Sequence, residues 1–430
     1  MTADTKPSFP AALKVYARIG LLSFGGPTAQ IALMHRELVE EQEWLTEDQF
    51  LNALSFCMFL PGPEAMQLAT YAGWRLHGTR GGLAAGLLFV MPGACFVLAL
   101  SMIYAALGNV PLVQAVFLGI KAAVLVIVVE ALLRIAKRAL SEPAHWVLAG
   151  LSFAAIFFFS LPFPLVIAAA ALAGFALARR GDTEAAPSSD APVTMRKTFA
   201  TVAIWLAVWI APLLSVAAVA GHGHVLAQAG LFFSKLAVVT FGGAYAVLAY
   251  MSQEVVQNYG WLSAGEMLDG LGLAETTNGP LILVTEFVGY LAGYRDGGLA
   301  MGLAAAAVAL WATFAPCFLW IFAGAPYVDR LQNAPMLRGA LAGVTAAVVG
   351  VILNLAIWFA LHVFFATVAE TPVGSLTLWV PDIATLDWRV VALAAASGFA
   401  LLRFRIGLAW TLALSAGLAF AWHLVAPVVS

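Results

Sequence analysis

The chain has 430 residues, of which 62% are apolar and only 10% are charged, and its formal net charge is −2 at pH 7. With a mean hydropathy of +0.93, it has too little polar surface to coat a soluble globule of this length. The composition therefore excludes a soluble enzyme or binding domain and predicts a polytopic protein of the lipid bilayer, with no nucleic-acid partner.

Apolar stretches, each long enough to cross the hydrocarbon core as a helix, recur along the whole chain. We expect an all-α fold of about thirteen transmembrane segments, taken in chain order as residues 13–34, 50–73, 81–107, 110–133, 146–159, 161–177, 199–219, 230–251, 267–292, 297–323, 334–365, 388–402 and 408–426.

The chain contains two copies of one sequence module. The motif Phe24-Gly25-Gly26 returns 217 positions later as Phe241-Gly242-Gly243. The same distance carries other Gly, Pro and Trp residues onto their counterparts without a gap: Trp44 onto Trp261, Gly62-Pro63 onto Gly279-Pro280, and Gly81 onto Gly298. A fixed spacing over so many positions predicts two homologous structural units.

The two copies are expected to run in opposite directions, because their Phe-Gly-Gly motifs fall in the first and eighth segments and seven crossings separate them. Inverted repeats are typical of secondary transporters. We place the N-terminal repeat at 1–178, a polar cytoplasmic linker at 179–198 and the C-terminal repeat at 199–430. Lys and Arg gather in the connections on the side of the N-terminus, which predicts a cytoplasmic N-terminus and a periplasmic C-terminus.

The repeated positions are also helix breakers. Proline removes a backbone donor, and paired glycines allow conformations closed to other residues. The four segments that hold these motifs should therefore be broken helices. Broken backbone at membrane depth survives where it is buried in protein or lines a wet cavity, so two matched pairs of breaks predict one central site. Simple proline kinks without function are the alternative.

Basic residues indicate the sign of the ligand. Arg18 and Lys235 correspond at the same offset, and Lys121 lies deep in the fourth segment. Ionisable residues within a membrane usually face a site or a path, although Arg18 and Lys235 lie near segment starts and can also snorkel to headgroups. Broken helices add N-termini that attract anions.

The sequence thus predicts a pocket for a compact oxyanion. Its candidate binding residues are Arg18, Gly25, Gly26, Pro27, Gln30, Pro61, Gly62, Pro63, Gln67, Lys235, Gly242, Gly243, Thr277, Asn278, Gly279 and Pro280. The polar side chains among them have an equally open alternative role, which is to bond backbone carbonyls freed by the breaks.

Acidic residues within apolar segments are candidates for proton coupling, namely Glu64, Glu275 and Glu286, with helix capping as the alternative role for each. The chain shows no zinc-protease motif, nucleophile elbow or phosphate loop. Its three cysteines have unrelated spacings. We therefore expect no catalytic residues, no metal and no cofactor.

The chain resembles the chromate ion transporter family. The resemblance is carried by Ser23 to Pro27, by Trp44-Leu45, by the run from Leu60 to Gln67 and by Tyr71 to Trp74, and the second copy resembles the C-terminal domain of the family through Thr240 to Gly243 and Asn278-Gly279-Pro280. The resemblance implies a two-domain bacterial inner-membrane protein that exports chromate and confers chromate resistance, with sulfate as a similar, competing ion. Together with the inverted repeats, it predicts transport by alternating access. A carrier for uptake of sulfate or another oxyanion, and a passive anion channel, stay open as alternatives, and a homodimer is also left open.

Overall fold

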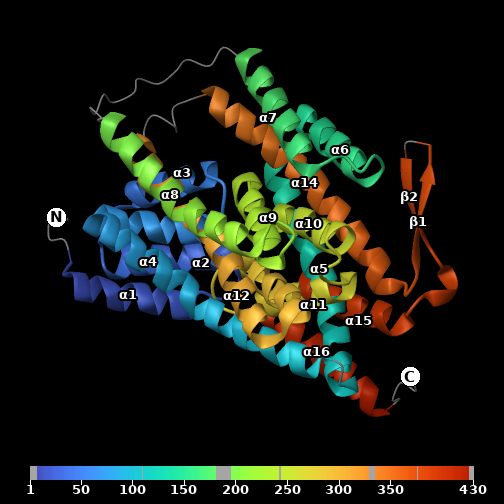
Figure 1. The fold of residues 1–430 in the computed structure, drawn as a ribbon. Helices are drawn as coiled ribbons and strands as arrows, with labels where there is room; N and C mark the ends of the chain where they lie inside the picture. The colour runs from blue at the N-terminus through green and yellow to red at the C-terminus, as the bar shows by residue number, and fades with distance from the viewer. Residues whose placement is uncertain are drawn as a thin grey trace. The chain divides into compact units, whose positions relative to one another are not determined.

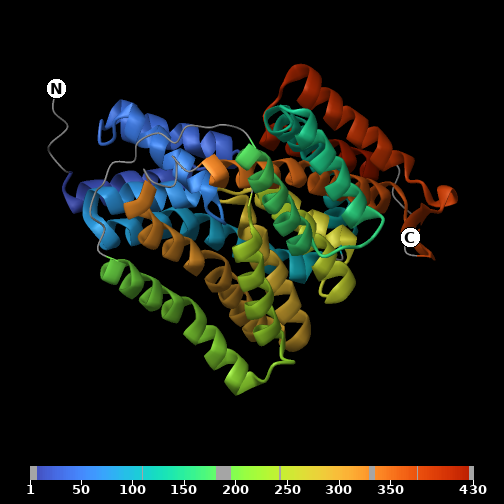
Figure 2. The same ribbon diagram turned by 90° about the horizontal axis from the view of Figure 1, so that it is seen from above.

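The computed structural model describes residues 7–108, 110–180, 195–241, 244–328, 335–374 and 376–425. These residues form helices almost throughout (Figures 1 and 2). In this part of the chain, six helical stretches are long and apolar enough to cross a membrane: 64–107, 111–139, 195–220, 281–327, 335–364 and 408–425. The expected all-α polytopic membrane fold is confirmed. Gly242, Gly243 and the linker residues 181–194 lie outside the described residues.

The two copies fold into the same order of elements, apart from one additional 3-10 turn in the second. The first contains α1 (Phe9–Leu22), α2 (Gly26–His35), the π-helix η1 (Arg36–Glu41), α3 (Glu47–Phe59) and α4 (Glu64–Leu107). The second contains α9 (Val225–Val239), α10 (Ala244–Gln253), the π-helix η2 (Glu254–Asn258), α11 (Ala264–Thr276), the 3-10 turn η3 (Leu281–Leu283) and α12 (Val284–Gly324). The last residues of α1 and α9, and both ends of α3 and α11, differ by 217 positions.

Four predicted segments are divided, which confirms the prediction of broken helices. Segment 13–34 is split between α1 and α2, and segment 50–73 between α3 and α4. Segment 230–251 is split between α9 and α10, and segment 267–292 between α11 and the η3–α12 stretch. At about 1.5 Å per residue, the 14 residues of α1 span about 21 Å, which is less than the hydrocarbon core.

Helices α4 and α12 each contain a second interruption. In α4, His77 and Gly78 leave the helical conformation, and in α12 Gly297 and Gly298 do so with closely similar angles. A methyl group on Gly73 would overlap the carbonyl oxygen of Gly81, so the two arms of α4 fold back on each other. The match of Gly81 with Gly298 is therefore wrong. The structural partner of Gly298 is Gly78, because the second copy has three more residues between its break and its turn.

The described helices pack into two compact units, and each unit contains segments of both copies. Unit 1 comprises 1–102, 183–244 and 277–335, and unit 2 comprises 103–182, 245–276 and 336–430. In unit 1, α12 packs against α9 and against α8 (Met195–Ala220), as Figure 1 shows. A short 3-10 turn, η4 (Ala325–Tyr327), follows α12.

Unit 2 is built around α5 (Pro111–Ala139), which packs against α11, α15 (Trp388–Gly398) and α16 (Leu408–Val425). Glycines allow the close approaches: a methyl group at Gly272 of α11 would overlap Ile120 of α5. The remaining helices are α6 (Pro143–Phe157), α7 (Phe163–Arg180), α14 (Pro335–Phe364), the 3-10 turn η5 (Ile383–Thr385) and the π-helix η6 (Phe399–Arg403).

A β-hairpin between α14 and α15 was not expected from the sequence. Strand β1 (Val368–Val373) pairs antiparallel with β2 (Leu376–Pro381), with Val368 opposite Pro381 and Val373 opposite Leu376 (Figure 1). Val and Thr favour extended backbone, and Gly374 adopts a φ of 64° at the turn. The stretch is too short and too polar to register as a transmembrane segment, which is why the hydropathy pattern missed it.

Candidate functional site

All four helix breaks belong to unit 1. We call them break A (residues 23–25), break B (60–63), break C (240–243) and break D (277–280). Glycine makes three of these bends possible, since Gly25, Gly62 and Gly279 have φ values of 88°, 121° and 89°, which disfavour any residue with a side chain. The sequence prediction that the breaks belong to one region is consistent with this shared unit.

The breaks are joined in pairs by two equivalent backbone hydrogen bonds. The amide of Gly279 donates to the carbonyl of Ser23 at 2.9 Å, and the amide of Gly62 donates to the carbonyl of Thr240 at 2.9 Å. Adding 217 to 62 and 23 gives 279 and 240, so the two bonds are the same contact with the roles of the copies exchanged. Such reciprocity is what two bodies related by a two-fold axis make.

The hydroxyl groups at the breaks repeat as well. Ser23 Oγ donates to the carbonyl of Ile19 at 2.6 Å, and Thr240 Oγ1 donates to the carbonyl of Leu236 at 2.6 Å. Each hydroxyl thus satisfies a carbonyl in the last turn of its helix. Helices α1 and α9 therefore end in the same way, with a hydroxyl group at the break that bonds a carbonyl of the last turn.

Buried amide side chains satisfy the carbonyls that the breaks release. Gln30 Nε2 donates to the carbonyl of Gly279 at 2.6 Å, Gln67 Nε2 to that of Pro61 at 2.7 Å, and Asn278 Nδ2 to that of Gly20 at 3.0 Å. The structure thus gives these residues the backbone-bonding role that the sequence left open. Their oxygens, Gln30 Oε1, Gln67 Oε1 and Asn278 Oδ1, are buried without a hydrogen-bond partner in the described part of the chain.

Close packing seals break D. A methyl group on Gly93 of α4 would overlap the carbonyl oxygen of Asn278 and would lie 2.7 Å from Leu283 Cδ1. By contrast, a methyl group on Gly26, at the start of α2, would meet no heavy atom within 4 Å among the described residues. Break D is therefore tightly enclosed, whereas open space adjoins the N-terminus of α2 beside Pro27.

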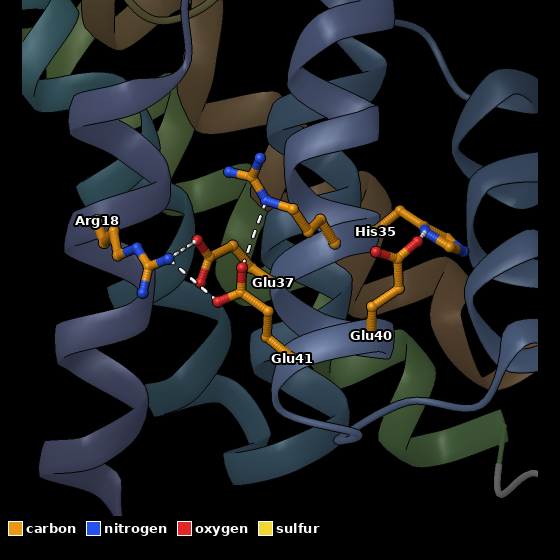
Figure 3. A network of polar contacts seen from close by, with 6 residues as sticks. Arg18, His35, Glu37, Glu40 and Glu41 are labelled. Atoms are coloured by element: carbon orange, nitrogen blue, oxygen red, sulfur yellow. Dashed lines mark hydrogen bonds and ion pairs between the residues drawn. The ribbon is translucent and has the colours of Figure 1, made fainter.

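Arg18 is engaged by carboxylates of η1 (Figure 3). Its Nη2 lies 2.8 Å from Glu37 Oε1 and 3.1 Å from Glu41 Oε2. Glu37 is fully buried at 0% exposure, whereas the side chain of Arg18 is 48% exposed. Arg36 Nε also reaches Glu41, at 3.5 Å. Arg18 is therefore first of all the cation of a buried carboxylate, a partnership that the sequence analysis did not foresee.

The other charged candidates have different surroundings. Lys235 lies on an exposed face of α9. Glu64 is the first residue of α4, where the helix dipole favours an acidic side chain. Glu286 of α12 is 1% exposed, and its Oε2 lacks a hydrogen-bond partner among the described residues. Glu275 belongs to unit 2, where Tyr245 Oη donates to its Oε1 at 2.5 Å.

One charged residue was missed altogether. Asp269 of α11 accepts a hydrogen bond from Tyr104 Oη at 2.8 Å, and Lys121 Nζ lies 3.3 Å from the same oxygen, Asp269 Oδ2. An available signal was the offset of 217, which aligns Asp269 with Asn52 and so marks a polar position within an apolar segment in both copies. Over the described ranges, the structure contains no group of three or more His, Cys, Asp or Glu residues that could hold a metal ion.

Both copies match a known protein family. The family model described as "Chromate transporter" matches residues 11–175 and again 227–421. A chromate transport protein of Pseudomonas aeruginosa is 34% identical over 358 residues, which is 80% of this chain and 79% of that protein. A chromate transport protein of Cupriavidus metallidurans is 31% identical over 84% of both chains. An uncharacterized transporter of Methanocaldococcus jannaschii is 27% identical over 83% of this chain and 87% of its own length. No solved structure matches the chain.

Proposed function

Since this chain belongs to the chromate transporter family, we propose that it is a secondary transporter that exports chromate across the bacterial inner membrane and so confers chromate resistance. The reciprocal pair of hydrogen bonds between the breaks carries the proposal. Many secondary transporters that work by alternating access consist of two similar repeats that meet at interrupted helices, and the substrate binds at the interruptions.

We place the oxyanion beside breaks A to D. Broken backbone within a membrane protein is tolerated where it is buried or lines a cavity, and the open space at Gly26 adjoins the N-terminus of α2, whose free N–H groups attract anions. Backbone groups are the main ligands in this proposal, because the amide nitrogens of Gln30, Gln67 and Asn278 already bond carbonyls. Thr277 is a further candidate for the lining, and Arg18 and Lys235 are the flanking charges. Gly242 and Gly243, which lie outside the described residues, stay candidates on the sequence alone.

The membrane potential can drive this export. A dianion that leaves a cell with a negative interior gains about 4.6 kcal/mol per 100 mV, at about 2.3 kcal/mol for each charge. Uptake of sulfate through the same site would instead need at least two protons to cancel the charge. Glu64, Glu275 and Glu286 are the proposed carriers of such protons.

The proposal is tested by flux of labelled chromate and sulfate into everted membrane vesicles, which present the cytoplasmic face outward. We expect saturable chromate uptake that grows with the potential and is inhibited by sulfate. Flux that rises linearly with concentration would instead indicate a passive channel, and proton-driven sulfate movement in the opposite direction would favour the uptake carrier.

Inverted repeats require that equivalent loops of the two copies face opposite sides of the membrane. Glu43 and Ser263, which follow η1 and η2, are both exposed. We therefore expect Glu43→Cys and Ser263→Cys, each in a background without Cys57, Cys95 and Cys317, to react with a membrane-impermeant maleimide from opposite sides. Labelling of right-side-out and everted vesicles measures this, and reaction of both positions from one side would contradict the inversion.

A further inference from the structure

Three polar side chains from three helices meet inside unit 2. Lys121 lies on α5, Asp269 on α11 and Tyr104 near the end of α4. Both Lys121 Nζ and Tyr104 Oη approach the same carboxylate oxygen, Asp269 Oδ2, at 3.3 Å and 2.8 Å. A methyl group on Gly265 would lie 3.1 Å from Lys121 Nζ, so the ammonium group occupies the space beside this glycine.

The second oxygen of the Asp269 carboxylate, Oδ1, is buried without a partner among the described residues. Asp269 as a whole is 3% exposed. A salt bridge that served packing alone would be expected to satisfy both oxygens, because an unpaired buried acceptor is costly. Lys121 is less enclosed, with 26% of its side chain exposed. The pair therefore combines a buried carboxylate with a partly exposed cation.

Other titratable side chains lie on the helices around this carboxylate. On α11 itself, Glu266 accepts the amide of Ser263 at the helix start, and Glu275 is bonded by Tyr245 at the helix end. On α5, Glu130 pairs with Arg134 at 3.2 Å. Helix α16, which also packs on α11, has His423 near its end as its one titratable side chain.

We propose that Asp269 is a proton-binding carboxyl that decides whether Lys121 is available to a tetrahedral oxyanion, at a binding position within unit 2 in addition to the one proposed beside the breaks of unit 1. With Asp269 ionised, the ammonium group of Lys121 is held by Oδ2. A proton that adds to Oδ1 makes the carboxyl neutral and releases Lys121, whose N–H groups then donate to the oxyanion. Departure of the proton restores the ion pair and expels the anion. This inference rests on the proposed function, since it assumes that the protein binds chromate.

In this scheme, binding of the proton and binding of the oxyanion are coupled. One proton and one oxyanion favour each other's binding, and the linkage is reciprocal. A dianion that travels with one proton still carries net negative charge, so a negative cell interior still favours its export. Coupling to Asp269 is therefore compatible with the proposed direction.

The test is chromate binding to the purified full-length protein in detergent at several pH values, with proton uptake followed by a pH-sensitive dye. In the parent protein, affinity should rise as the pH falls, by up to about tenfold per pH unit for one coupled proton. Asp269→Asn mimics the protonated carboxyl, so it should bind tightly at every pH and take up no proton. Lys121→Gln should weaken binding about tenfold or more. Protonation of chromate itself affects all variants equally, so it cancels when the affinities of two variants are compared at the same pH.

Glu266→Gln is the matched control, because it removes a carboxylate one helical turn away that bonds Ser263, and it should keep the parental steepness of the pH dependence and the proton uptake. If Asp269→Asn does not fold, Asp269→Glu retains a carboxyl and should retain the pH dependence and the proton uptake. A parental pH profile in Asp269→Asn, or parental affinity in Lys121→Gln, would overturn the inference while leaving the proposed function intact. A parent protein that binds no chromate at any pH would overturn both.

Discussion

Replacing Arg18 with glutamine is expected to destabilise the protein by about 3 kcal/mol, because the change leaves a buried carboxylate without its cation. Glu37 is 0% exposed, and Arg18 Nη2 lies 2.8 Å from its Oε1. The 48% exposure of the Arg18 side chain lets water screen part of the pair, so we expect the lower end of the range for buried pairs. Thermal or denaturant unfolding of the purified protein in detergent measures the effect.

A second substitution separates the ion pair from substrate binding. Arg18→Gln combined with Glu37→Gln removes both charges and should regain most of the lost stability. If Arg18 also contacts the oxyanion, this stable double variant should still bind chromate about tenfold or more weakly, as expected for the loss of a charge-assisted hydrogen bond. Parental half-saturation in the double variant would leave Arg18 with a purely structural role.

Arg36→Gln is the control for Arg18. Arg36 reaches Glu41 at 3.5 Å, and 53% of its side chain is exposed, so its ion pair lies at the surface. Surface pairs of this kind contribute about 0 to 1 kcal/mol. A loss of stability in Arg36→Gln as large as that in Arg18→Gln would show that burial of Glu37 is not the cause.

Replacing Gly93 with alanine is expected to force break D away from α4 and to abolish chromate transport. The added methyl group would overlap the carbonyl oxygen of Asn278, which is backbone and cannot rotate away. Overpacking of a well-packed core costs about 1 to 3 kcal/mol and sometimes more. We expect a lowered unfolding temperature together with the loss of flux in vesicles.

Gly150→Ala is the matched control for Gly93→Ala. Gly150 also lies within a helix, α6, but a methyl group there would meet no heavy atom within 4 Å in the described structure. Alanine should stabilise that helix by up to about 1 kcal/mol through its higher propensity. Full transport and parental stability in Gly93→Ala would contradict the close approach of α4 to break D.

Much of the fold could be predicted from the sequence, because its signals are local. Gly25, Gly62 and Gly279 adopt left-handed backbone at positions where their motifs predicted an interruption. The ends of α3 and α11 follow the repeat to the residue. The match of Gly81 with Gly298 failed because a fixed offset cannot register an insertion of three residues, and the hairpin was missed because hydropathy averages over windows longer than its strands.

The sequence by itself determined the membrane environment, the duplicated module and the four helix breaks, since composition, spacing and the backbone chemistry of glycine and proline do not depend on distant residues. Only the tertiary structure decided which groups meet. Gln30 donates a hydrogen bond to Gly279, 249 positions away. Glu37 forms an ion pair with Arg18, which the sequence analysis had assigned to the substrate, and Asp269 forms one with Lys121. These partners are selected by packing between helices far apart in the chain, and a buried charge or carbonyl takes whichever complementary group the packing brings within reach.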